Sequence, residues 1–230
     1  HHLSNESKLS LLVAPGSGED LGRIVRDESG AITAIVEAAE LGARDRGQES
    51  QINAGMYCFL AEWLWESLPN IKKSSVQEFY LTSLVHMAST QSARVEALEI
   101  EDPTEAIGIN NRLQLSHAET ALRHRIRERW MLEGISMLDP HSTFVDATVK
   151  LGQDTLILPN THVLGQTRIG KDCTIGPNTV IRDSTIGDGC AVMASFVEEA
   201  TVEESVNIGP FSHIRHGSHL EGNVYIGNYA

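Results

Sequence analysis

Three histidines near the end of the chain, His213, His216 and His219, are spaced three residues apart, as in a small metal-binding cluster. Their imidazole nitrogens would supply the ligands. All three fall, however, in a six-residue repeat whose geometry places them at different corners of a coil. We therefore interpret them as surface residues.

Two other sets of residues could carry chemistry but do not have the spacing for it. Cys58, Cys173 and Cys190 form no CxxC or His-paired pattern, which indicates reduced, mostly buried thiols of a cytosolic protein. Gly16-Ser17-Gly18 follows an expected strand, as a phosphate-binding loop would. The carboxylates of the next residues, Glu19-Asp20, would repel phosphate. We interpret this segment as a flexible turn.

The composition limits the class of protein. The 230 residues are 41% apolar, which is enough for one large or two modest cores. Lys and Arg number 18 against 31 Asp and Glu, so the net charge is −13, and this argues against a nucleic-acid partner. Small anionic substrates need only a few local donors. The sequence contains neither an apolar run near the roughly 18 residues of a membrane helix nor a signal peptide.

A hexapeptide repeat organises the chain from about Asp139 onward. Aliphatic residues recur fifteen times, six residues apart except for three steps of five. A glycine often follows the aliphatic residue, and a small residue usually lies two positions before it. The aliphatic positions are Val145, Leu151, Ile157, Val163, Ile169, Ile175, Ile181, Ile186, Val192, Val197, Val202, Ile208, Ile214, Leu220 and Ile226.

This spacing predicts a parallel β-helix of about five coils. Six residues form one flat face and three faces form one coil, with the aliphatic side chain pointing inward and the small one near the corner. We expect the glycines to relieve backbone strain at the turns. Alternating β-sandwich strands would not keep a six-residue phase this long. The chain stops at Tyr229-Ala230 without a capping segment, so we expect it to be part of a longer protein.

The residues before the repeat predict alternating strands and helices, and hence an α/β sheet. One long helix is expected at Arg112–Glu133, with an apolar stripe and Gly134 as its C-terminal cap. The stripe comprises Leu115, Ala118, Leu122, Ile126 and Trp130. The other expected elements are strands at 9–14 and 52–60, a hairpin of 23–27 with 31–37, a helix at 74–89 capped by Ser74 or Ser75, and a strand at 94–100.

Six segments then resemble family motifs, in the family's order. Five resemble motifs of sugar-phosphate nucleotidyltransferases, and the sixth resembles the acetyltransferase pattern G-P-F-[AS]-x-[LI]-R-P-G followed by G-N-F. The five are Leu21-Gly22-Arg23-Ile24-Val25-Arg26-Asp27, Ile35-Val36-Glu37, Ile52-Asn53-Ala54-Gly55, Gln77-Glu78-Phe79-Tyr80-Leu81-Thr82 and Gly108-Ile109-Asn110-Asn111-Arg112-Leu113-Gln114-Leu115. The sixth is Gly209-Pro210-Phe211 with Arg215 and Gly217, then Gly227-Asn228.

The ordered set resembles the bacterial bifunctional N-acetylglucosamine-1-phosphate uridylyltransferase and glucosamine-1-phosphate acetyltransferase family. The resemblance implies a partial Rossmann-like nucleotidyltransferase domain at 1–111, a linker helix at 112–138 and a left-handed hexapeptide β-helix at 139–230. It implies a cytoplasmic homotrimer, assembled through the β-helix, that makes UDP-N-acetylglucosamine for cell-wall precursors. UTP and acetyl-CoA would be co-substrates and Mg²⁺ the cofactor.

The resemblance also assigns roles to particular residues. Gly22 would let the backbone approach the sugar, while Glu37 and Asn53 would bind it. Asn110 would bind substrate and ligate Mg²⁺ through its amide oxygen; otherwise it, or Asn111, is the N-cap of the long helix. Arg215 would bind the sugar phosphate in the acetyltransferase site.

Two positions depart from the family, since His216 replaces a proline and Ser83 an aspartate. The family's UTP-phosphate loop, base-recognition residues and one metal-binding Asp would precede His1, and its acetyl-transfer histidine and acetyl-CoA groove would follow Ala230. We therefore expect no catalytic residue of either reaction in this chain, and little or no turnover by these 230 residues alone.

An alternative is a single-function sugar-1-phosphate nucleotidyltransferase whose β-helix only assembles trimers. A second alternative is a scaffold without activity.

Overall fold

The computed structural model describes residues 7–16, 21–41 and 50–230. Residues 17–20, which include most of the expected turn after the first strand, lie outside the described residues. The chain divides into two units, His1–Ala118 and Glu119–Ala230. None of the described helices is both long and apolar enough to cross a membrane.

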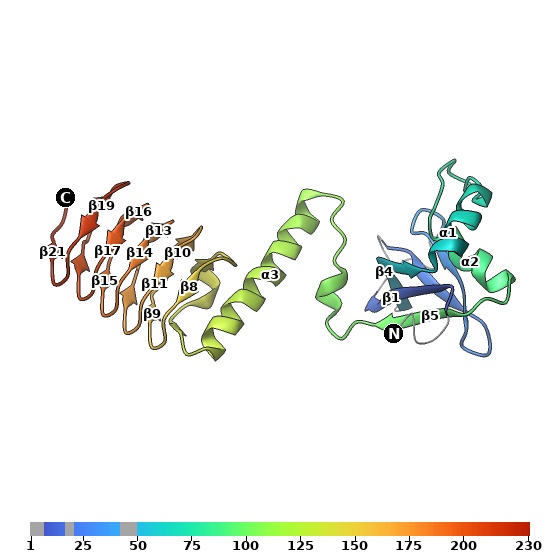
Figure 1. The fold of residues 1–230 in the computed structure, drawn as a ribbon, viewed down its shortest axis with the longest axis horizontal. Helices are drawn as coiled ribbons and strands as arrows, with labels where there is room; N and C mark the ends of the chain where they lie inside the picture. Colours follow the sequence, from blue (N-terminus) through green and yellow to red (C-terminus); the bar gives the residue numbers. More distant parts are fainter. Residues whose placement is uncertain (1–6, 17–20, 42–49) are drawn as a thin grey trace. The chain divides into compact units, whose positions relative to one another are not determined.

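The first unit contains a five-stranded mixed sheet of order β3-β2-β4-β1-β5 (Figure 1). Strand β1 pairs antiparallel with β4 and parallel with β5, and its buried residues Leu9, Leu11 and Val13 form the core of this unit. These strands confirm the predicted ones. The bounds are β1 Leu9–Gly16, β2 Arg23–Arg26, β3 Ile32–Val36, β4 Ser50–Phe59, α1 Ala61–Ser67, η2 Leu68–Asn70, α2 Ser83–Thr90, β5 Val95–Glu99 and η3 Pro103–Ala106.

The helix predicted at 74–89 is wrong in its first half. Only α2, Ser83–Thr90, is helical, and the preceding segment closes a tight turn through a bridge between Lys73 and Phe79. Gln77 lies in the left-handed region at φ 64°, which a helix cannot contain. Thr82, rather than Ser74 or Ser75, is the N-cap residue.

The long helix α3, Arg112–Leu132, confirms the predicted one, and Gly134 follows it at φ 96°. The predicted apolar stripe is buried only toward its end. Ile126 and Trp130 pack in the core of the second unit, whereas Leu115 and Leu122 are half exposed.

The second unit is a parallel β-helix built on three sheets, as the repeat predicts (Figure 1). Each coil contributes one short strand to each sheet, and every strand pairs in parallel with its equivalent in the next coil. The bounds are β6 Ser136–Met137, η4 Pro140–Ser142, β7 Thr143–Val145, β8 Lys150–Leu151, β9 Leu156–Ile157, β10 Thr161–Leu164, β11 Arg168–Ile169, β12 Thr174–Ile175, β13 Val180–Arg182, β14 Thr185–Ile186, β15 Ala191–Val192, β16 Phe196–Glu198, β17 Thr201–Val202, β18 Asn207–Ile208, β19 His213–Ile214, β20 His219–Leu220 and β21 Tyr225–Ile226.

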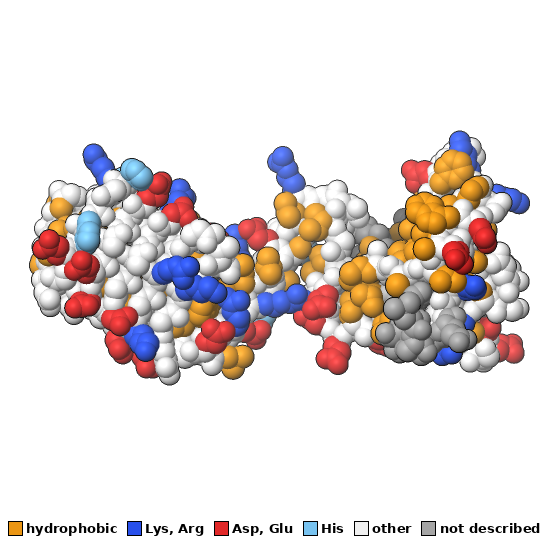
Figure 2. All heavy atoms as spheres, viewed as in Figure 1, with side chains coloured by type: hydrophobic (Ala, Val, Ile, Leu, Met, Phe, Trp, Pro, Cys, Tyr) orange, Lys and Arg blue, Asp and Glu red, His pale blue; other side chains and the backbone are white. Residues whose placement is uncertain are grey.

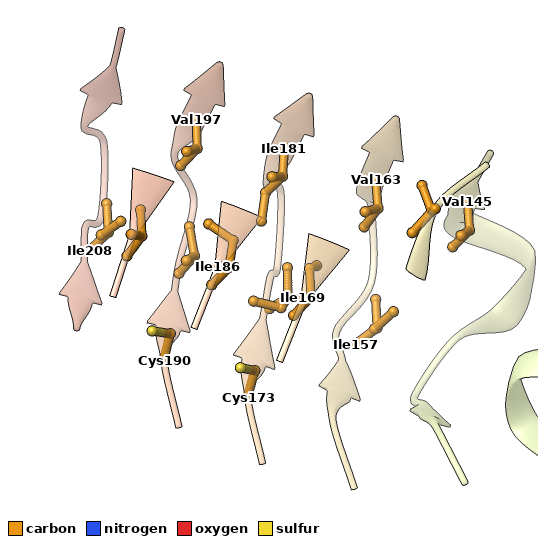
Figure 3. Close-up of a cluster of buried hydrophobic side chains, with 14 of the residues drawn as sticks. Val145, Ile157, Val163, Ile169, Cys173, Ile181, Ile186, Cys190, Val197 and Ile208 are labelled. Carbon is orange, nitrogen blue, oxygen red and sulfur yellow. The ribbon is translucent and has the colours of Figure 1, made fainter. Parts of the chain in front are cut away.

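The interior of the β-helix is filled as the hexapeptide pattern predicts. Val163, Ile181 and Val197 lie in register on successive coils and are fully buried (Figure 3). The small residues are buried beside them and satisfy corner carbonyls, as when the thiols of Cys173 and Cys190 donate to the carbonyl oxygens of the next coil at 3.1 and 2.9 Å. All three cysteines are free, and Cys58 is exposed.

The glycines that follow the aliphatic residues have two different causes. Gly176 and Gly209 have positive φ, so for them backbone conformation is the reason, as predicted. Gly152 does not, but a Cβ there would lie 2.4 Å from the carbonyl carbon of Gly170 in the next coil. Close approach of two backbones therefore excludes a side chain at that position.

We expect Gly152→Ala to lower the free energy of unfolding by about 1–3 kcal/mol, because the backbone of the next coil must shift. Gly227→Ala is the matched control, since a Cβ there meets nothing within 4 Å. Urea unfolding followed by circular dichroism measures both variants. Equal stability of the two would contradict the close-approach explanation.

The three histidines at the C-terminal end each face a glutamate of the preceding coil. The ring nitrogens of His213, His216 and His219 lie 3.0, 2.8 and 2.8 Å from carboxylate oxygens of Glu198, Glu199 and Glu203. Figure 2 shows histidine side chains beside acidic ones on these coils. The histidines thus belong to separate surface pairs, and the described residues contain no cluster of three metal-ligand side chains.

The pair of His219 and Glu203 predicts a stability that falls in acid. The hydrogen bond with His219 lowers the pKa of Glu203, and the backbone N–H of Gly222 adds to the shift. A lowered folded pKa stabilises the fold above the unfolded value of about 4.3, and this contribution is lost as pH falls through the folded pKa. We expect His219→Ala to reduce the loss of hydrogen-exchange protection in the last coil as the pH falls from neutral through the folded pKa of Glu203. The exposed control His117→Ala should not, and an equal effect of the two variants would contradict the pairing.

Candidate functional site

Three of the predicted site residues are brought together by strand pairing in the first unit. Strand β2 pairs with β3 so that Arg23 faces Val36, which places Gly22 opposite Glu37. The backbone N–H of Asn53 in β4 donates to the carbonyl oxygen of Gly22 at 2.8 Å. Residues from three separate motifs therefore meet at one end of the β3-β2-β4 part of the sheet.

Gly22 faces the Glu37 carboxylate at close range. A Cβ on Gly22 would lie 3.4 Å from Glu37 Oε2 and 2.7 Å from Ile35 Cγ2. A side chain here would crowd both neighbours and cover one face of the carboxylate. The absence of a side chain keeps Oε2 open as an acceptor.

The second oxygen of Glu37 is already occupied. Thr82 Oγ1 donates to Glu37 Oε1 at 2.5 Å, across 45 residues of sequence. The hydroxyl of Thr82 is thereby withdrawn from capping α2, to which it makes no side-chain hydrogen bond. This contact fixes the orientation of the half-buried carboxylate and anchors the start of α2 to the site.

Asn53 is buried at 8% exposure and presents a donor. Its Oδ1 accepts the backbone N–H of Gly55 at 3.0 Å, so the amide NH₂ is the donor end of the side chain. Tyr57 lies close by. Burial raises the pKa of Tyr57 to about 12, while the side chain of Asn53 opposes the shift and the charge of Glu37 adds to it. Tyr57 is therefore a neutral neighbour at physiological pH.

Asn110 precedes α3, and the structure separates its role from that of Asn111. Gln114 N–H donates to Asn111 Oδ1 at 2.9 Å, while Gln114 Oε1 accepts the backbone N–H groups of Asn110 and Asn111 at 2.6 and 3.2 Å. This reciprocal pair is a capping box, so Asn111 is the N-cap. The exposed amide side chain of Asn110 makes no hydrogen bond to the described residues, which leaves its oxygen available. Gly108, two residues earlier, lies beside Leu21, since a Cβ there would be 3.1 Å from Leu21 Cδ2.

Arg215 lies in the second unit, directly after β19, where it is exposed. Its carbonyl oxygen accepts the N–H of Ser218 at 3.1 Å, which closes the local turn. Its guanidinium forms no ion pair within the described part of the chain. His216, which replaces the family proline, turns instead toward Glu199.

Gly22, Glu37 and Asn53 thus form an acceptor and a donor beside an open backbone surface. A sugar can use this arrangement, because a ring hydroxyl can donate to Glu37 Oε2 while another oxygen accepts from the Asn53 amide. The charged acceptor gives the stronger of the two hydrogen bonds.

The sequence of this chain is similar to those of known proteins. Residues 148–183 match the family described as bacterial transferase hexapeptide (six repeats). A protein of Halalkalibacterium halodurans named bifunctional protein GlmU is 38% identical over 231 residues, which is 100% of this chain and 50% of that protein. Those of Caldanaerobacter subterraneus and Synechococcus elongatus, of the same name, are 45% identical over 195 residues (84% of this chain, 42% of that protein) and 37% over 230 residues (100% and 50%).

The chain is similar to one half of a GlmU protein. It spans about half the length of the curated relatives it matches. The resemblance predicted from six short motifs is confirmed by these alignments, and the hexapeptide match confirms the β-helix. Both units lie within the region shared with the GlmU proteins of the first and third relatives.

Sequence reasoning missed two residues of the cluster. Thr82 ends one of the motifs that resemble the family, yet the sequence gives no sign that its hydroxyl binds Glu37. Tyr57 carries no signal, since it lies in an apolar strand like any core aromatic residue. It lies in the same strand as Asn53, and the charge of Glu37, which follows another strand, also acts on it.

Proposed function

We propose that this chain is part of a bifunctional enzyme of UDP-N-acetylglucosamine biosynthesis. One reaction transfers uridylyl from UTP to N-acetylglucosamine 1-phosphate, and the other transfers acetyl from acetyl-CoA to glucosamine 1-phosphate. The observation that carries the proposal is the convergence of Gly22, Glu37 and Asn53 from three motifs, in a chain similar to GlmU proteins along its whole length.

In the uridylyl transfer, the first unit binds the sugar phosphate. Glu37 accepts a hydrogen bond from a ring hydroxyl, the Asn53 amide donates to a sugar or acyl oxygen, and Gly22 leaves room for the ring. The attacking oxygen belongs to the sugar phosphate and the leaving group is pyrophosphate. The contribution of these residues is therefore to orient the nucleophile for in-line attack.

One side chain of this unit, that of Asn110, is suited to ligate Mg²⁺. The Asn110 amide oxygen is a hard ligand that the capping box leaves free. The described residues contain no group of three His, Cys, Asp or Glu side chains that could hold a metal ion. Asn110 is therefore the one Mg²⁺ ligand that we propose among the described residues. When bound, the ion would neutralise charge that develops on the phosphate oxygens.

In the acetyl transfer, Arg215 binds the phosphate of glucosamine 1-phosphate. Its exposed, unpaired guanidinium on the β-helix has the fork of donors that phosphate requires. The β-helix would also assemble three copies of the protein. We propose both roles because of the hexapeptide fold and the similarity to GlmU proteins.

Assay of the full-length protein that contains this chain tests the proposal. Pyrophosphate release from UTP and N-acetylglucosamine 1-phosphate reports one reaction, and thiol release from acetyl-CoA with glucosamine 1-phosphate reports the other. We expect both. Activity in neither assay would overturn the proposal, and uridylyl transfer alone would replace it by the single-function alternative.

A further inference from the structure

An open cavity of the first unit lies apart from the cluster of Gly22, Glu37 and Asn53, none of which lines it. It has a volume of about 450 Å³ and is bordered by the edge strand β3, the end of η2 with the two residues after it, and the first half of α2. Pockets that bind small molecules have volumes of roughly 300–1,000 Å³. The cavity is therefore large enough for a small organic ligand.

Part of the lining of this cavity is apolar. Ala34, Ile35, Ile71 and Met87 line it, and all four are half-buried. A methionine side chain is flexible and polarisable, and it makes favourable contacts with aromatic rings. An occupant with a compact hydrocarbon body would therefore cover apolar surface that water now contacts.

The charged part of the lining is basic. Lys72 and His86 line the cavity, and no Asp or Glu does. This local charge is opposite to that of the whole chain, in which 31 acidic residues outnumber 18 Lys and Arg. Both side chains are exposed, and neither makes a hydrogen bond or an ion pair with the described residues. Their N–H groups are therefore open to an anionic occupant.

Position 83 lacks a carboxylate that would counter these two side chains. Ser83 replaces the aspartate of the family motif, is the first residue of α2 and lines the same cavity. An aspartate here would attract the Lys72 ammonium and repel an anion in the cavity. The serine hydroxyl is neutral and can itself donate a hydrogen bond.

We propose that this cavity binds a small amphipathic carboxylate, that is, one carboxylate group on a hydrocarbon body. The two carboxylate oxygens would accept hydrogen bonds from Lys72 and from His86 or Ser83, while the body covers Ile71 and Met87. A phosphate dianion suits the cavity less well, because its further oxygens would lose water beside apolar side chains without gaining donors. The inference does not depend on the proposed function.

Isothermal titration calorimetry of the full-length protein with 2-naphthoate tests the site, and 2-naphthamide, which has the same body without the charge, is the control probe. We expect naphthoate to bind at least about tenfold more tightly than naphthamide. Lys72→Met removes the charge, so it should raise the Kd for naphthoate about tenfold and change that for naphthamide less than about twofold. Lys73→Met is the matched control, since Lys73 lies over the Phe79 ring and does not line the cavity.

Ser83→Asp is a second test that leaves Lys72 in place. It puts a carboxylate into the lining, and α2 should keep its structure because Asp is favourable in the first turn of a helix. The variant should bind naphthoate about tenfold more weakly than wild type and naphthamide equally well. Equal wild-type affinity for the two probes, or no binding of either, would overturn the proposal. A naphthoate Kd that Lys72→Met and Ser83→Asp leave unchanged, or that Lys73→Met raises as much as Lys72→Met, would overturn it too.

Discussion

Replacing Ile181 by alanine is expected to lower the free energy of unfolding of the β-helix by about 3 kcal/mol, within the 2–5 kcal/mol typical of such truncations. Ile181 is fully buried, and its strand β13 lies between β10 and β16 in the middle of one sheet. Removing the Ile181 side chain would leave a cavity in the β-helix interior, where each coil packs against the next. Since repeat stability is largely a sum over neighbouring interfaces, both interfaces of this coil should weaken.

The adjacent residue provides the control for this prediction. The Arg182 side chain is half exposed and lies 3.7 Å from Glu198, so Arg182→Ala should change stability by less than about 0.5 kcal/mol. Urea unfolding with hydrogen exchange of β-helix peptides measures both variants. A cost below about 1 kcal/mol for Ile181→Ala would show that the interior collapses around the cavity.

The second large effect concerns the sugar site. In the full-length protein, Glu37→Gln should reduce kcat/KM for N-acetylglucosamine 1-phosphate in uridylyl transfer about 10- to 100-fold. The variant keeps the shape of the side chain and an acceptor for Thr82, but it loses the charged acceptor beside Gly22. A hydrogen bond to a charged group contributes about 1.5–3 kcal/mol, which corresponds to this range.

Glu40→Gln is the matched control, because Glu40 is exposed three residues further on and its contact is with Ser75. Its kcat/KM should stay within about twofold of wild type, as expected for a surface change. Acetyl transfer should be unchanged in both variants. Equal activity of Glu37→Gln and wild type would remove Glu37 from the sugar site.

The β-helix could be predicted from sequence alone because each repeat meets the same surroundings. Every aliphatic position faces the same narrow interior, so the environment is repeated with the sequence and the six-residue period reports it directly. The physical reason for a glycine at a particular position was harder to predict from the sequence. Gly152 is required by the backbone of Gly170, a contact between coils rather than a local conformation.

The polar contacts of the first unit could not be derived this way. The motifs identified Gly22, Glu37 and Asn53 as a set, but their meeting depends on strand register. The helix predicted from residue 74 fails for the same reason. Thr82 binds a carboxylate 45 residues away. Its position at the start of α2, and not inside a longer helix, goes with this tertiary contact.

By itself, then, the sequence determined the hexapeptide architecture, the long helix and the family resemblance, because periodicity and local motifs are properties of neighbouring residues. The tertiary structure decided that Asn111 caps α3 while the Asn110 side chain makes no hydrogen bond to the described residues, and that Thr82 orients Glu37. Each of these depends on the local geometry of the folded chain or on atoms distant in sequence, where burial and competing hydrogen-bond partners set the outcome.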